Sequence, residues 1–167
     1  VSYSAKTPIS FAEASSYGLS QISVVDRHVE ISVSEVPSGT FTFNGFASFA
    51  DGISFPIDYS EYGLISNLTL NANFDNDTLT GTMHNFQNYF GSLSGTVNVN
   101  GSISGKDISA TTSGILSQSG ATISNSGTMS GRFFGKHISG ETATSVGGVM
   151  SGTSGSSNYV GIFTGQR

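Results

Sequence analysis

The sequence predicts an all-β protein whose main part is a single eight-stranded antiparallel up-and-down barrel, with an N-terminal extension and one short helical link. The first observation behind this is a strict two-residue alternation of apolar and polar side chains, typical of strands with one buried and one wet face. The second is the short Gly-, Asn-, Asp- and Ser-rich segments between these stretches, which favour tight turns. The third is composition: of 167 residues, 22 are Gly and only 10% are charged, so Ser, Thr and Asn form the polar faces.

Residues 1–38 differ in pattern from the rest of the chain. Residues 10–13 fit a helix-capping box, and Gly18 is suited to end the short helix that follows. Residues 21–25 and 28–36 then alternate as strands, and Pro37-Ser38-Gly39 predicts a turn. We expect residues 1–38 to be an extension that packs on the barrel, or the remainder of a larger domain, and residues 39–167 to be the barrel domain.

Eight strands are predicted from Thr40 onward, and eight antiparallel strands suit a small closed barrel whose interior is filled by side chains. Their predicted ranges are 40–49, 64–74, 79–84, 93–103, 108–116, 122–131, 146–152 and 159–165. Phe46 breaks the alternation and falls on the polar face, whereas Phe133 keeps the buried parity and is expected in the core. Glycines within the strands are expected where the sheet bends sharply or where a large neighbour needs room.

Several classes of function are disfavoured by composition and motifs. The net charge of −5 and the lack of a basic run argue against nucleic acid, and the absence of Cys excludes disulfides and thiolate metal sites. No apolar run approaches the length of a membrane-spanning helix. No Gly-x-Ser-x-Gly motif is present, and His28, His84 and His137 lack metal-ligand spacing. Asp75-Asn76-Asp77 is interpreted as a turn rather than a calcium loop, and the protein is not expected to be an enzyme.

Two connections are too apolar for ordinary turns. Residues 51–62 carry Phe55, Tyr59 and Tyr62, and residues 83–90 carry Phe86, Tyr89 and Phe90. Both should lie at the same end of an up-and-down barrel, where clustered aromatic side chains are typical of a partner-binding surface. The alternative interpretation is that these side chains cap the open end of the barrel and are buried.

The end of the chain carries a family resemblance. It combines an aromatic corner, Gly131-Arg132-Phe133-Phe134-Gly135, a strand containing Gly147-Gly148-Val149-Met150-Ser151-Gly152, and a last strand ending Gly161-Ile162-Phe163-Thr164-Gly165. This order resembles the C-terminal barrel of transferrin-binding-protein-B-like lipoproteins, over roughly residues 39–166. In that family the corner reads Gly-x-Phe-Tyr-Gly and is usually followed by Pro, whereas this chain has Phe134 and Lys136 at those places.

The resemblance implies a non-catalytic binding protein of the bacterial cell surface, secreted or periplasmic, that captures a host protein or iron and haem. An outer-membrane receptor or a translocator is an implied partner, while the family's lipid-anchoring Cys does not occur in this sequence. Because some relatives bind haem, His84, with Tyr89 nearby, is a candidate axial ligand. The alternative from another class is a structural module that only displays another domain of a larger surface protein.

Overall fold

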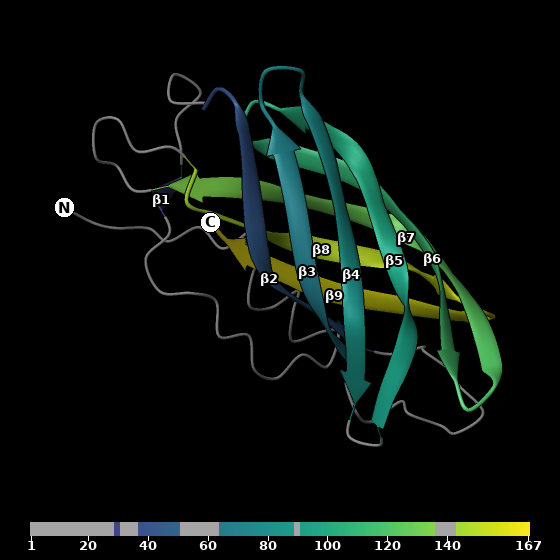
Figure 1. The fold of residues 1–167 in the computed structure, drawn as a ribbon. Coiled ribbons are helices and arrows are strands. Elements are labelled where there is room, and N and C mark those ends of the chain that lie inside the picture. Colours follow the sequence, from purple (N-terminus) through teal and green to yellow (C-terminus); the bar gives the residue numbers. More distant parts are fainter. Residues whose placement is uncertain (1–28, 31–36, 51–63, 89–90, 136–142) are drawn as a thin grey trace.

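A computed structural model of the chain describes residues 29–30, 37–50, 64–88, 91–135 and 143–167. The strands in these ranges are arranged as a barrel with its long axis running between two distinct ends (Figure 1). They are β1 (Val29–Glu30), β2 (Thr40–Ala50), β3 (Leu64–Asn73), β4 (Thr78–Asn88), β5 (Gly91–Ser104), β6 (Asp107–Gln118), β7 (Ala121–Gly135), β8 (Ser145–Ser154) and β9 (Ser157–Gln166).

Strands β2 to β9 close into an eight-stranded antiparallel barrel, which confirms the predicted fold class. Each strand pairs with the next along the chain, and β9 returns to pair with β2 from Asn44↔Gln166 to Ala50↔Val160. Because the sheet is closed, each of these eight strands pairs with a neighbouring strand on both sides. The barrel therefore has no edge strand of the kind at which sheets aggregate. Strand β1 is an addition to the barrel: it pairs with the end of β7 at Phe134 and Gly135, just beyond Arg132, which pairs with Asp107, the first residue of β6.

The described residues contain no helix, and so none long and apolar enough to cross a membrane. The predicted helical link after Gly135 falls on residues 136–142, and the predicted N-terminal helix falls on residues 10–18. Both lie outside the described residues, as do most of the strands expected before Pro37.

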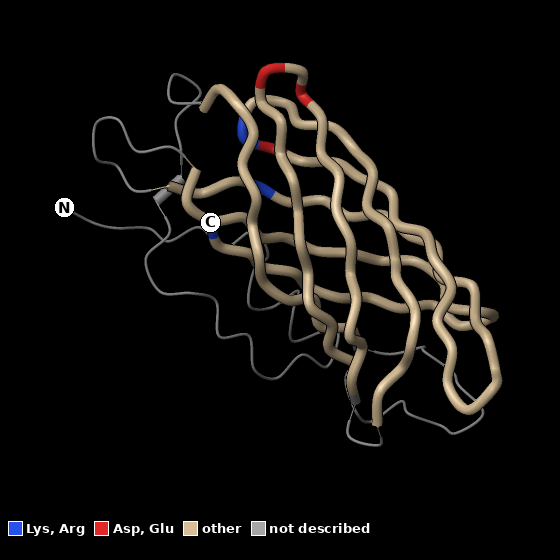
Figure 2. The backbone as a smooth tube through the Cα atoms, viewed as in Figure 1, with Lys and Arg blue, Asp and Glu red and all other residues tan. Residues whose placement is uncertain are grey.

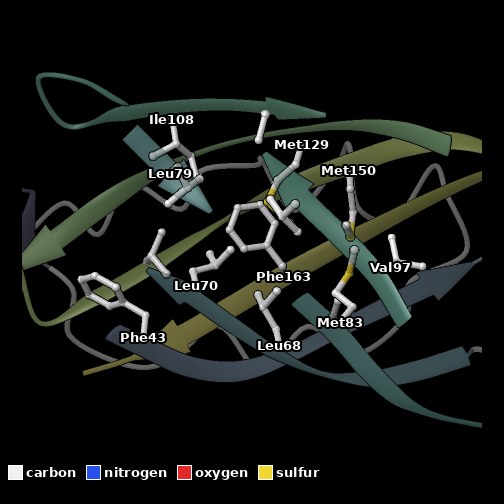
Figure 3. Packing of buried hydrophobic residues seen from close by; sticks show 14 of the residues in the cluster. Phe43, Leu68, Leu70, Leu79, Met83, Val97, Ile108, Met129, Met150 and Phe163 are labelled. Carbon is white, nitrogen blue, oxygen red and sulfur yellow. The ribbon is translucent and has the colours of Figure 1, made fainter. Parts of the chain in front are cut away.

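Inward-facing apolar side chains from all eight barrel strands fill the interior (Figure 3). Phe133 is fully buried, with its ring 5.2 Å from that of Phe43 and 4.9 Å from that of Phe74, so its predicted place in the core is confirmed. Phe46 points outward and is 45% exposed, as its break in the alternation predicted. The interior of the barrel is therefore filled by packed side chains, as expected for eight strands.

The two ends of the barrel differ in their connections. At one, the turn end, lie the β3–β4 turn, the β5–β6 turn, the start of β2 and the end of β9. At the other, the loop end, lie the β2–β3 and β4–β5 connections and the tight β6–β7 and β8–β9 turns. The β6–β7 turn shows why short Gly- and Ser-rich segments predict turns. Ser119 and Gly120 both have positive φ, 50° and 84°, as the type I′ hairpin turn requires.

Candidate functional site

The loop end is the candidate binding site, because β2 and β4 both run toward it and both apolar connections begin there. This common origin follows from the up-and-down strand order, as expected. Five of the six aromatic residues assigned to the surface lie outside the described residues, namely Phe55, Tyr59, Tyr62, Tyr89 and Phe90. Their role in partner contact therefore stays a prediction.

Phe86, the sixth residue, is in the core and not on an accessible surface. Its side chain is 1% exposed, and its ring centroid lies 6.1 Å from that of Phe49. The sequence placed the end of this strand at residue 84, but β4 continues to Asn88 through a β-bulge between Met83 and Phe86. Asn85 has a positive φ of 53° in this bulge, and the extra residue returns Phe86 to the inward parity of Met83.

His84 lies in strand β4 rather than in a loop, and its side chain is half-buried. It pairs across the outer face with Asn67 of β3, next to the bulged residue Asn85. Haem sites combine an axial ligand with an apolar pocket. The residue paired with His84, Asn67, and its outward neighbour on β4, Thr82, are both polar, and the exposed Ile65 lies two residues from Asn67 on β3.

Beneath the loop end, the interior holds a chain of hydrogen bonds that the sequence analysis missed. The Tyr159 hydroxyl is 3.3 Å from Thr112 Oγ1 and donates to Asn125 Oδ1 at 3.3 Å, and all three residues are buried. Burial raises the pKa of the Tyr159 hydroxyl, and the hydrogen bond with Thr112 offsets part of this rise. The sequence contains one signal of this hydrogen-bond network. Thr112, Asn125 and Tyr159 all occupy inward positions of strand faces that are otherwise apolar.

The charged residues whose side chains the structure describes gather at the turn end (Figure 2). They are Asp75, Asp77, Lys106, Asp107, Arg132 and Arg167. Arg132 lies on the outer face of β7, and its Nε donates to Asp107 Oδ1 at 2.7 Å. Among the residues that the structure covers, no group of three or more His, Asp and Glu is arranged to hold a metal ion.

The outer wall between the two ends is neutral and polar, because two adjacent rows of outward residues run across β2 to β8. One row, in cross-strand register, is Thr42, Asn71, Thr80, Asn100, Thr111, Thr128 and Ser151. The other is Asn44, Thr69, Thr82, Asn98, Ser113, Ser126 and Thr153. Three large apolar side chains interrupt the wall elsewhere, Phe46, Ile65 and Ile115.

Comparison with known proteins identifies the barrel. The family model for the C-lobe and N-lobe β-barrels of transferrin-binding protein B matches residues 36–167, which include all of β2 to β9. No curated protein matches the chain significantly. Because the family match covers most of the chain and agrees with the closed eight-stranded architecture, this chain belongs to the family of transferrin-binding protein B β-barrels.

Proposed function

We propose that this protein is a non-catalytic binding module of a bacterial surface that holds a host protein of the transferrin class at the loop end of its barrel. The observation that carries the proposal is the common origin of two connections, residues 51–63 and 89–90, at one end of a rigid closed barrel. Rigid scaffolds with aromatic residues on clustered loops are the usual form of protein recognition sites.

Two further observations support a role in binding. The family description itself refers to transferrin binding. The interior beneath the loop end is filled by large side chains, including Phe49, Phe86 and Tyr159, with the rings of Phe49 and Tyr159 5.5 Å apart in an edge-on arrangement. Such a filled core gives a protein partner no entry to the barrel interior, which supports contact at the connections.

The test is binding of purified protein to a mammalian serum transferrin, iron-loaded and iron-free, by biolayer interferometry. We expect saturable binding that falls at least about tenfold in Tyr59→Ser and Tyr89→Ser, because aromatic anchors of an interface contribute about 2 kcal/mol or more. Ile115→Ser is the matched control: Ile115 is a large apolar side chain 59% exposed on the outer face of β6, apart from the two connections.

Two results would overturn the proposal. An absence of binding by the wild-type protein removes transferrin as the partner and favours a display module. A large loss of stability in Tyr59→Ser and Tyr89→Ser, with binding per folded molecule unchanged, makes the aromatic side chains a cap of the barrel. A haemin titration in parallel tests haem: a shifted Soret band that is lost in His84→Ala would make His84 an axial ligand.

A further inference from the structure

The neutral outer wall contains a shallow hollow of about 370 Å³. Its lining on β3 and β4, Asn71 and Thr80, lies close to the charged β3–β4 turn. Its sides are two three-residue segments of the polar rows: Asn71, Thr80 and Asn100 on one side, and Thr82, Asn98 and Ser113 on the other. Between them lies the backbone of Gly81 and Val99, which pair directly across β4 and β5. The hollow is thus a shallow, open trough that crosses the strands, and its sides are outward positions two residues, or about 7 Å, apart along each strand.

The polar groups along the trough are largely unused by the protein. Asn71 Oδ1 accepts a hydrogen bond from Thr42 Oγ1 at 2.8 Å, which leaves its NH2 group available. Within the described parts of the chain, the side chains of Thr80, Thr82, Asn98, Asn100 and Ser113 make no hydrogen bond. Three amides and three hydroxyls therefore line the trough, and each amide supplies both donors and an acceptor.

The trough also carries no charge. Its six polar side chains are Asn, Thr and Ser, and the charged residues of the described chain lie at the turn end. With a net charge of −5, the protein repels rather than attracts anionic ligands, and no cation in the trough compensates. The matching ligand is neutral, presents many hydroxyl groups that both donate and accept, and lies over the open trough in contact with both rows.

We propose that this trough is a binding site for a neutral oligosaccharide, with the chain of sugar rings lying across β3 to β6. Vicinal sugar hydroxyls pair with the NH2 and C=O groups of Asn71, Asn98 and Asn100, and the Thr80, Thr82 and Ser113 hydroxyls complete the contacts. The polar rows continue beyond the trough on both sides, so longer chains gain further contacts. This site is separate from the loop end, and it does not depend on the proposed transferrin binding.

The test is an NMR titration of the ¹⁵N-labelled protein with maltoheptaose, cellohexaose, laminarihexaose and lacto-N-tetraose, followed through the backbone and Asn side-chain amide signals. We expect saturable shifts at the trough for at least one of these probes. The affinity falls at least about tenfold in Asn98→Ala/Asn100→Ala, since two lost hydrogen bonds of about threefold or more each combine. Asn158→Ala is the matched control, an exposed Asn on β9 outside the trough.

A hyaluronan hexasaccharide serves as the anionic comparison, and we expect it to give no saturable shift. Binding of the neutral probe should also be the same at 50 and 500 mM NaCl, because no ion pair is formed. The proposal is overturned if none of the four neutral probes gives a saturable shift, if Asn98→Ala/Asn100→Ala binds as the wild type does, or if hyaluronan binds equally well.

Discussion

Aromatic side chains of β9 take the space that side chains of β7 and β8 would otherwise fill. Tyr159 lies in register with Gly152 and Gly127, and Phe163 lies in register with Gly148 and Gly131. A Cβ atom placed on Gly148 would approach Phe163 Cε1 to 2.8 Å, and one on Gly152 would approach the Tyr159 hydroxyl to 2.8 Å. The four-residue spacing of these glycines on both strands thus matches the four-residue spacing of the two rings.

Gly148→Ala should destabilise the protein by about 1–3 kcal/mol, as overpacking of a core does. The added Cβ meets fixed backbone of β7, Ser130 O and, at 2.5 Å, Gly131 Cα, so no side-chain rotation relieves it. This exceeds the gain of up to about 1 kcal/mol from restricting the unfolded chain. Urea unfolding measures the effect, with Ser151→Ala, an exposed neighbour on β8, as the control. Equal midpoints for both variants would contradict the packing described here.

Phe133→Ala should cost about 3–5 kcal/mol, because a fully buried ring that contacts Phe43 and Phe74 is replaced by a cavity. Phe46→Ala removes the same side chain at a position 45% exposed, and its effect should be far smaller. Thermal and urea unfolding of the two variants provide the comparison. Similar losses for both would mean that burial does not determine the contribution of these rings.

The Tyr159 hydroxyl should make stability fall at alkaline pH. Its pKa is raised by burial, so the folded state holds this proton more tightly than the unfolded state, in which the pKa is about 10. Its contribution is present in full below pH 10 and is lost as the pH rises through the folded-state pKa. Above about pH 10 the free energy of unfolding should decline less steeply with pH in Tyr159→Phe than in the wild type. Identical slopes would show that this hydroxyl is not shielded from water.

At the scale of elements, alternation predicted all eight barrel strands, and it failed where the chain leaves strict alternation. The strand that was predicted to end at residue 84 runs to Asn88, because a bulge at Asn85 shifts the parity and makes the sequence look irregular. The strand predicted to end at Gly131 runs to Gly135, with Phe133 facing inward and Phe134 outward. A bulge depends on local backbone conformation, to which a simple two-residue pattern is blind.

The bulge itself gives a prediction at Asn85. A φ of 53° is tolerated by Asn and Gly but costs about 1–2 kcal/mol for other side chains, most of all for β-branched ones. Asn85→Val should therefore lower the free energy of unfolding by about this amount, whereas Asn85→Gly should change it by less than about 0.5 kcal/mol. Chemical denaturation of both variants decides: an equal effect of Val and Gly would mean that β4 does not hold this conformation in solution.

On the scale of the whole molecule, the fold was more predictable than the site. Hydrophobic periodicity is a property of many residues together, so single irregularities such as Phe46 do not hide it. A site depends on which side chains reach the surface, and Phe86 shows that an aromatic residue in an irregular stretch can belong to the core. The neutral trough was not predicted because its sides combine residues of four strands, and their register becomes known only from the paired sheet.

Residues 39–167 should fold without residues 1–38, because every barrel strand has both of its barrel neighbours within this range. Removal of β1 takes away the strand paired with Phe134, an outward-facing ring that is only 3% exposed. Uncovering a phenyl ring costs about 1.5–3 kcal/mol, so residues 39–167 should melt cooperatively but at a lower temperature than the full chain. Phe134→Ser in residues 39–167 is the control. Exposure of the Phe134 ring should lower the solubility of residues 39–167, and this substitution should recover part of that loss. A β-sheet circular dichroism spectrum with no cooperative transition for residues 39–167 would show that the N-terminal residues are part of the folding unit.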